Sequence, residues 1–286
     1  KAIYKKEVKS YLTSMIGYVF IFFILLLEGI YFTAYNLQNA YPLFGTTLSA
    51  VTFIFLILVP VLTMKTIAEE RKQKTDQLLL TAPVSVSEIV LGKFLAVATV
   101  YAIPVLIICL YPMIMGKYGT VSYAMAYTAV LGFALLGFAQ IAVGVFWSSV
   151  TENPVIAAVV TFIVLFVCYM ITGIGSLIPD SSMASLACYM LLVLLAAVWI
   201  YHMIRNLWIA AVIGIAGEAA FAITYVVKST LFEGSIQKFL AVFDITSHFD
   251  NFTNGILDLQ GVVYFLSVII IFLVLTVQTI TKRRWN

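Results

Sequence analysis

The sequence predicts an all-α membrane protein that crosses the bilayer several times, and two observations carry this prediction. Hydrophobic residues make up 63% of the 286 positions and charged residues only 10%, with a mean hydropathy of +1.08. The apolar residues gather in runs of about 20, the length that a helix rising about 1.5 Å per residue needs to cross roughly 30 Å of hydrocarbon. Backbone exposed to lipid must satisfy its own hydrogen bonds, so each run is expected to be a helix.

Eight apolar runs predict eight spans, a six-span core with an additional hairpin. The spans are expected near residues 16–35, 45–65, 94–115, 123–147, 155–178, 184–201, 207–227 and 261–281. The stretch 183–227 is too long for one crossing and contains His202 and Arg205, which favours a hairpin of two spans. A chain with six spans is the alternative.

The basic residues predict the orientation. With the N-terminal segment in the cytoplasm, only Lys117, Lys228 and Lys238 of the 16 lysines and arginines fall on the outer side. Because basic loops stay in the cytoplasm, both termini are expected there. Residues 1–14 are too short and too charged to span, and they predict an amphipathic helix lying on the inner membrane surface.

The loop 66–92 is predicted to be cytoplasmic and concentrates much of the chain's charge. Within it, Thr75, Leu78, Leu79 and Ala82 follow the spacing i, i+3, i+4, i+7, which predicts an apolar stripe on a short helix. Pro83 is expected to end that helix, because proline cannot continue the hydrogen-bond ladder. The sequence therefore predicts a short amphipathic helix that could meet a partner.

A helical stalk is expected to precede this short helix. Glu70 and Lys74 are spaced i, i+4 in the favourable order, so they are expected to pair and to extend the helix of the second span beyond the membrane.

The sequence gives little support for an ATPase, another enzyme, a metal site or a nucleic-acid-binding protein. The chain has no G-x-x-x-x-G-K-[ST] phosphate-binding loop, so ATP hydrolysis would need another polypeptide. No nucleophile–base arrangement, paired carboxylates or metal-binding spacing is present. The three cysteines fall in or beside apolar runs, where they are expected to be small hydrophobic residues. A net charge of +3 gives no indication of a nucleic-acid partner.

Two acidic residues fall inside predicted spans, Glu28 in the first and Glu218 in the seventh. A carboxyl within the membrane is costly unless it is paired, protonated or turned inward. Each could line a transport route, contact a partner subunit or bond to a neighbouring helix as a neutral acid. Gly214 and Gly217 favour close helix packing, which inclines Glu218 towards the last of these.

Residues 228–260 form the only sizeable outer loop. Its aromatic residues predict two short amphipathic helices, one around Phe239 and one around Phe252. These helices could act as an external gate or serve as interfacial anchors.

The charged loop carries a family resemblance. The run EERKQKTDQLLLTAPVSVSEIVLGKFLA resembles the signature of ABC-2 type transporter permeases, approximately E-R-x-x-G-T-x-E-x-L-L-x-x-P-[VIL]-S followed by a span starting near G-K. Lys74 stands where the pattern has glycine and Gln77 where it has glutamate. The closing stretch from His248 onward is similar to permeases of the gliding-motility-type branch. The matching residues are Glu70, Arg71, Thr75, Leu79, Pro83, Val84, Ser85, Gly92 and Lys93.

This resemblance implies half of an exporter in the cell membrane of a bacterium. Such a chain pairs with a second permease subunit and with cytoplasmic ATPase subunits that hold ATP and Mg²⁺, and it binds no cofactor itself. Membrane lipids and an accessory membrane subunit with an extracellular domain are further partners that the resemblance admits. It implies that the ATPase is contacted through Glu69, Glu70, Arg71, Thr75, Leu78, Leu79 and Pro83.

Two rival functions remain open from the sequence. One is a self-sufficient secondary transporter or channel, and the other is a membrane scaffold for an extracellular assembly. A secondary transporter would show broken helices in symmetric halves and an intramembrane ion site, and no clear repeat is visible. The cargo is not readable from the residues.

Overall fold

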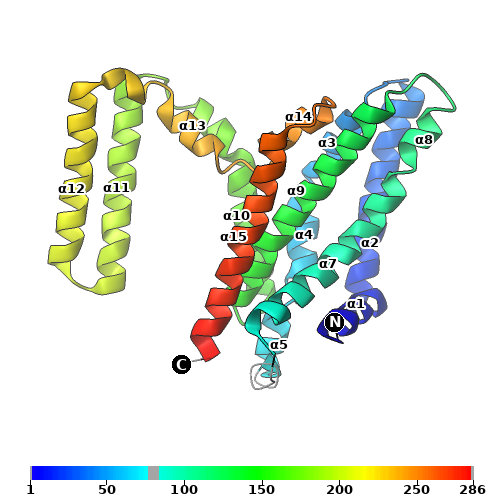
Figure 1. Ribbon diagram of the computed structural model, residues 1–286, viewed down its shortest axis with the longest axis horizontal. Helices are drawn as coiled ribbons and strands as arrows, with labels where there is room; N and C mark the ends of the chain where they lie inside the picture. Colours follow the sequence, from blue (N-terminus) through cyan, green and yellow to red (C-terminus); the bar gives the residue numbers. More distant parts are fainter. Residues whose placement is uncertain (1, 77–83, 285–286) are drawn as a thin grey trace. The chain divides into compact units, whose positions relative to one another are not determined.

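Helices joined by turns and short loops account for residues 2–76 and 84–284, which this computed structural model describes (Figure 1). No strand occurs in these two ranges. The chain divides into two compact units. Unit 1 comprises Lys1–Phe166 and Ile245–Asn286, and unit 2 comprises Val167–Asp244.

Unit 1 is built around the long helix α9, which contacts α3, α4, α7, α14 and α15. Over its apolar window 72% of the residues are buried, more than in any other long apolar helix among the described residues. The helices and helical turns of unit 1 are α1 (Ala2–Thr13), α2 (Met15–Tyr31), η1 (Phe32–Gln38), α3 (Phe44–Thr52), α4 (Phe55–Thr63), α5 (Ala68–Lys72), α7 (Val86–Ile108), α8 (Tyr111–Met115), α9 (Tyr123–Val150), η3 (Ser247–Phe249), α14 (Asp250–Thr253) and α15 (Leu259–Arg284).

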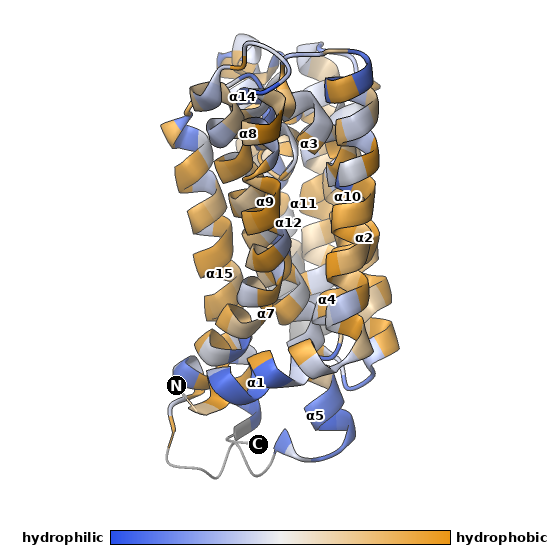
Figure 2. Ribbon diagram, turned by 90° about the vertical axis from the view of Figure 1, so that its right-hand side faces the viewer, coloured by the Kyte–Doolittle hydropathy of each residue, from blue (hydrophilic) through white to orange (hydrophobic). Residues whose placement is uncertain are grey.

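Six described helices are long and apolar enough to cross a membrane, or up to eight if two bent helix pairs each count as a span. This agrees with a polytopic all-α membrane protein. Figure 2 shows apolar residues along the long helices and hydrophilic residues gathered on α1 and α5.

The expected second span is broken rather than straight. Helices α3 and α4 meet at a bend of 60°. At this bend the backbone N–H groups of Ile54, Leu56 and Ile57 each bond to the carbonyl three residues earlier. These tighter 3₁₀-type bonds interrupt the α-helical ladder and redirect the chain. Apolar residues continue through the bend, so hydropathy alone does not reveal it.

The first span also changes its geometry. After α2 the helix widens into the π-helix η1, Phe32–Gln38. Buried Asn36 holds this segment in place: its Nδ2 donates to the carbonyl of Tyr41 at 2.8 Å, and its Oδ1 accepts from the Thr47 hydroxyl at 2.5 Å. The wide turns are therefore tied to the start of α3.

Unit 2 contains the predicted hairpin and the first part of the outer loop. Helices α11 (Ser182–Ile204) and α12 (Leu207–Val227) pack closely where glycines face the partner helix. A Cβ atom on Gly217 would lie 2.9 Å from Val193 Cγ1, and one on Gly214 would lie 3.1 Å from Ala197 Cβ. η2 (Ser229–Phe232) and α13 (Ser235–Ala241) follow α12. Helix α10 (Pro154–Ser176) begins in unit 1 and ends in unit 2.

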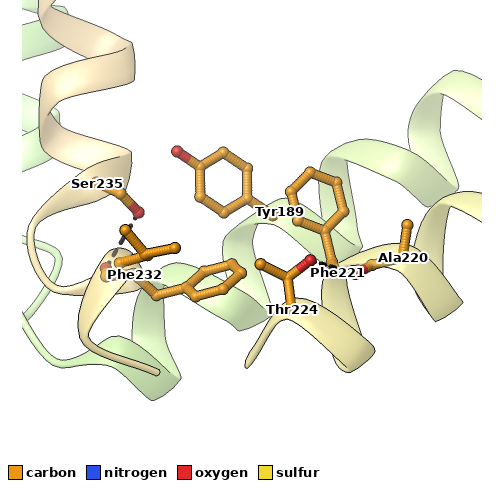
Figure 3. A pocket seen from close by; sticks show the side chains of 7 residues that line it. Tyr189, Ala220, Phe221, Thr224, Phe232 and Ser235 are labelled. Atoms are coloured by element: carbon orange, nitrogen blue, oxygen red, sulfur yellow. Dashed lines mark hydrogen bonds between the residues drawn. The ribbon is translucent and has the colours of Figure 1, made fainter. Parts of the chain in front are cut away.

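An aromatic cluster joins the hairpin to η2 within unit 2. Tyr189 stacks on Phe221 with ring centroids 5.1 Å apart, and Phe232 meets both rings edge to face. These rings border a pocket of about 330 Å³ that also carries the hydroxyls of Thr224 and Ser235 (Figure 3).

Candidate functional site

Charged side chains gather at the end of unit 1 where the loop 66–92 leaves α5 and returns to α7. We call one set of them the polar clamp: Glu7, Glu70, Arg71, Lys93 and Glu152. They come from α1, α5, α7 and the turn between α9 and α10. Elements far apart in the sequence therefore meet here.

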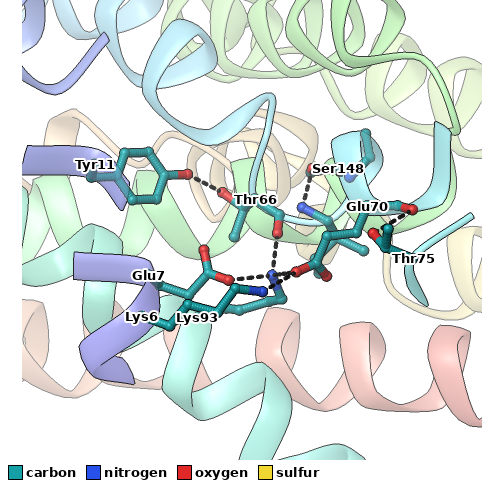
Figure 4. A network of polar contacts seen from close by, with 10 residues as sticks. Lys6, Glu7, Tyr11, Thr66, Glu70, Thr75, Lys93 and Ser148 are labelled. Carbon is teal, nitrogen blue, oxygen red and sulfur yellow. Dashed lines mark hydrogen bonds and ion pairs between the residues drawn. The ribbon is translucent and has the colours of Figure 1, made fainter. Parts of the chain in front are cut away.

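Lys93 is the centre of the clamp. Its side chain is only 2% exposed, yet all three ammonium protons have acceptors (Figure 4). Nζ lies 2.9 Å from Glu70 Oε1 and 3.1 Å from Glu7 Oε1, and it donates to the carbonyl of Thr66 at 2.8 Å. One buried cation thus fixes α1, the end of the second span and the start of α7 to one another.

Helix α1 is held against this centre by two further contacts. The hydroxyls of Tyr11 and Thr66 are hydrogen-bonded at 3.0 Å. Burial raises the pKa of the Tyr11 phenol, and the nearby carboxylates of Glu7 and Glu70 raise it further, so the phenol stays neutral. At Gly92 the α7 backbone is close to α1, because a Cβ atom there would lie 3.3 Å from Ile3 Cγ2.

Arg71 makes the opposite side of the clamp. Its Nη1 donates to the carbonyls of Ser149 and Thr151, the latter at 3.0 Å, and its Nη2 lies 3.1 Å from Glu152 Oε1. Arg283 near the end of α15 also approaches Glu152, at 3.7 Å. Neighbouring Glu70 and Arg71 therefore reach in different directions, Glu70 to α1 and α7 and Arg71 to the end of α9.

The expected pair between Glu70 and Lys74 is wrong. Helix α5 ends at Lys72, and Lys74 has a left-handed backbone with φ of 56°. The amide of Thr75 bonds to the carbonyl of Glu70 at 2.9 Å, and that of Lys74 bonds to the carbonyl of Arg71 at 3.1 Å. These two bonds form a Schellman motif, whose left-handed position favours glycine. The left-handed turn ends α5 before Lys74, so Lys74 is not placed one helical turn after Glu70. Glu70 pairs with Lys93 instead.

Lys74→Gly is expected to raise the free energy of unfolding by roughly 0.5–1 kcal/mol, because glycine adopts the left-handed conformation without a Cβ clash. Thermal unfolding of the purified chain in lipid nanodiscs measures this. Lys72→Gly, inside α5, is the matched control and should destabilise by about 1 kcal/mol. Equal effects from both variants would contradict the turn assigned to Lys74.

The charged loop is capped where it returns to the helix. Ser85 Oγ accepts from the amide of Glu88 and Glu88 Oε2 accepts from the amide of Ser85, both at 3.3 Å. This capping box starts α7. Both ends of the loop are thus fixed by local backbone motifs next to the clamp.

The remaining residues expected to contact a partner fall in several places. Glu69 accepts from Gln73 Nε2 at 2.7 Å, and the Thr75 hydroxyl bonds to the carbonyl of Glu70. Leu78, Leu79 and Pro83 lie outside the described residues, and so does most of the short helix expected around them.

A hollow of about 660 Å³ opens beside the clamp between α1 and α5. It is lined mainly by polar and charged side chains, among them Lys6, Ser10, Lys65, Glu69 and Gln73. The clamp thus borders a polar recess beside the point where the loop leaves.

The two acids within the spans differ in their surroundings. Glu28 is completely buried in unit 1, and neither of its carboxyl oxygens has a hydrogen-bond partner among the described residues. Glu218 is half-buried on α12 in unit 2. Across the part of the chain that the structure describes, no group of three or more histidine, cysteine or acidic side chains could hold a metal ion.

The two aromatic residues expected at an outer gate also differ. Phe239 is 41% exposed on α13, whereas Phe252 is 0% exposed inside unit 1. The Phe252 ring packs on Phe265 and lies against Gly132 and Gly261, where added Cβ atoms would be 2.5 Å and 2.7 Å from it. Phe252 thus fixes α14 to α9 and α15, and in this conformation it is not a surface residue.

Sequence reasoning identified Glu70, Arg71 and Lys93 but missed Glu7 and Glu152. Glu7 lies on the polar face of α1, where charge is expected in any case, and its partner Lys93 is 86 residues away. Nothing in the local pattern marks such a contact. The pattern S-x-x-E at Ser85 and Glu88 would have revealed the capping box.

Unit 1 thus has the make-up of a polytopic membrane protein with one charged loop held at its polar end. The family model described as ABC-2 family transporter protein matches residues 28–277. The chain therefore belongs to the ABC-2 transporter family, whose membrane subunits are permeases and not ATPases. No curated protein matches the chain.

Proposed function

We propose that this chain is the permease subunit of an ABC-2 exporter, working as a pair of permease subunits driven by separate ATPase subunits that hold ATP and Mg²⁺. The observation that carries the proposal is the polar clamp. It ties the inner ends of several spans to the two ends of one charged loop, so a force on that loop would reach the spans directly.

In the proposed topology the chain crosses the membrane of a bacterial cell eight times. Helix α1, the loop 66–92 and the end of α15 lie in the cytoplasm. The outer segment, residues 228–260, lies on the opposite face of the membrane. Supporting it, α1, α5 and the end of α15 lie together at the polar end of unit 1 (Figure 1). From the resemblance of its closing stretch, we further propose that the chain is of the gliding-motility-type branch and works with an accessory membrane subunit.

In this proposal the ATPase docks on the coupling loop through Glu69, Thr75, Leu78, Leu79 and Pro83. Glu70 and Arg71 face inward instead and pass the movement to the clamp. Closure of the ATPases then shifts α5 and α7 together, because Lys93 joins them.

Expression of the chain together with a candidate ABC ATPase from the same organism tests this function. We expect the two proteins to co-purify, ATP turnover to require the ATPase, and the chain alone to hydrolyse no ATP. The variant Leu78→Asp/Leu79→Asp should insert normally and lose the ATPase, whereas Lys72→Asp at an exposed position of α5 should keep it. ATP turnover by the chain alone, or transport without any ATPase, would contradict the proposal.

Pairing of two permease subunits is tested by crosslinking. In a background lacking Cys109, Cys168 and Cys188, a single cysteine at exposed Phe239 is expected to form a disulfide between subunits whose yield depends on the nucleotide bound. A cysteine at buried Phe252 should not. Absence of any crosslink along 228–243 in every nucleotide state would contradict a gate formed between the two subunits by the outer segment.

A further inference from the structure

Glu28 is an acid buried deep in a predicted span. The span formed by α2 and η1 runs from Met15 to Gln38, and Glu28 lies 13 residues after Met15, about 20 Å along a helix that rises about 1.5 Å per residue. This distance places the carboxyl well inside roughly 30 Å of hydrocarbon. Its exposure is 0%.

The face of the helix that carries Glu28 is the core face. Phe20, Ile24, Glu28 and Phe32 follow one another at intervals of four residues and are all buried, whereas Ile30 is 55% exposed. This face packs against α3, α4 and α7. The burial of Glu28 is therefore part of the chain's own packing.

Few titratable groups face Glu28 from these elements. The sequences of α3 and α4 contain none. The phenols of Tyr101 on α7 and Tyr111 on α8 lie nearby. The hydroxyl of Tyr101 already donates to the carbonyl of Phe133 at 2.7 Å. Charged residues of α1 and Lys93 of α7 belong to the polar end of unit 1, where Lys93 is engaged in the clamp.

No basic group therefore compensates an ionised Glu28 from the surrounding described elements, and no hydrogen-bond donor reaches either oxygen. A carboxylate without partners in apolar surroundings is strongly unfavourable, whereas the neutral acid is tolerated.

A means of moving Glu28 lies directly after it. The π-helix η1 begins four residues further on and extends over seven residues. Wide turns of this kind hold an extra residue relative to an α-helix, and they occur frequently at functional sites. If the wide turns move along the helix past Glu28, its side chain turns by one residue step, about 100° at 3.6 residues per turn. It then takes the direction of Leu27 or Gly29, both partly exposed.

We propose that Glu28 is an intramembrane proton-binding site that holds its proton while buried, and that a shift of the π-helical turns of η1 along the span changes the surroundings of this carboxyl. The existence of the site depends only on this chain, whereas its use in transport rests on the proposed function.

The first test uses the purified full chain in lipid nanodiscs. Infrared spectroscopy should show the C=O stretching band of a carboxylic acid at neutral pH. We expect this band in the wild type and in Glu218→Gln, and its loss in Glu28→Gln. An unchanged spectrum in Glu28→Gln would overturn the proposal.

A second measurement uses only the wild type, so it remains informative even if Glu28→Gln does not fold. Dicyclohexylcarbodiimide adds to protonated carboxyls in apolar surroundings, and peptide mapping by mass spectrometry locates the adduct. We expect labelling of Glu28 and not of exposed Glu152 at neutral pH. Labelling of Glu152 but not of Glu28 would show that Glu28 carries no proton.

The use of this proton site in transport is tested in the assembled transporter. The rate of ATP turnover by the complex with its ATPase should depend on pH. Glu28→Gln should weaken this pH dependence, whereas the control Glu218→Gln should leave it as in the wild type. Identical pH profiles for Glu28→Gln and the wild type would show that the site is not used in transport. A complex that never forms, with the infrared band still present, would instead count against the proposed function and leave the proton site intact.

Discussion

Lys93→Met is expected to lower the free energy of unfolding by about 3–5 kcal/mol, because two mostly buried carboxylates lose their shared partner and only Glu70 keeps another cation nearby, the exposed Lys6 at 3.9 Å. Lys93 Nζ lies 2.9 Å from Glu70 and 3.1 Å from Glu7, and these acids are only 17% and 12% exposed. Chemical unfolding of the purified chain in detergent micelles measures the loss. Lys72→Met, at an exposed position of α5, serves as the control and should be nearly neutral.

A triple variant separates the charge from the shape of the cluster. In Glu7→Gln/Glu70→Gln/Lys93→Met the buried lysine and both of its carboxylate partners are neutral, so most of the lost stability is expected to return. The triple variant should then fold without the ion pairs that join α1, α5 and α7. If it were as unstable as Lys93→Met alone, the packing of the lysine chain and not its charge would hold these helices together.

Arg71→Lys is the second change with a large expected effect. Arg71 donates from a planar fork to two backbone carbonyls and to Glu152, and a lysine ammonium cannot reproduce this geometry. Hydrogen bonds that involve a charged group contribute about 1.5–3 kcal/mol each, so the loss of one or two should cost roughly 2–5 kcal/mol. Thermal unfolding together with hydrogen exchange at the end of α9 would measure the effect and locate it.

Arg283→Lys is the matched control for this prediction. Arg283 is 43% exposed on its side chain and lies 3.7 Å from the same Glu152 oxygen. Exposed ion pairs of this kind contribute about 0–1 kcal/mol. Equal losses from Arg71→Lys and Arg283→Lys would contradict the role assigned to the buried arginine.

The sequence was sufficient to predict the class of fold. The hydropathy of a run depends only on its residues, and the thickness of the bilayer sets the length of about 20 residues that a spanning run must have. The sequence did not reveal the bend between α3 and α4, since apolar residues fit both segments equally well. The burial of Phe252 was also hidden. An amphipathic pattern shows that an aromatic face must be covered, but it does not show whether lipid, a second subunit or the same chain covers it.

The site was predictable to the extent that it is local. Glu70 and Arg71 stood out because a charged loop between spans is unusual, and the position of Lys74 was marked by a family glycine. The structure explains that glycine by the left-handed backbone at Lys74. The i, i+4 rule predicted the wrong partner for Glu70 because it assumes a continuous helix, and the Schellman turn ends the helix first. Glu7 and Glu152 could not be predicted, because each contacts a partner more than 80 residues away in the sequence.

The central claim is that movement of the ATPase reaches the outer face of the permease through the polar clamp. The most direct test measures how fast a membrane-impermeant thiol reagent labels a single cysteine at Phe239, in the complex with the ATPase, with and without ATP. With the native clamp we predict a labelling rate that changes with nucleotide. With Glu7→Gln/Glu70→Gln/Lys93→Met, in which the ATPase should stay bound and active, we predict a rate that no longer responds. The same nucleotide-dependent change in both complexes would contradict the claim.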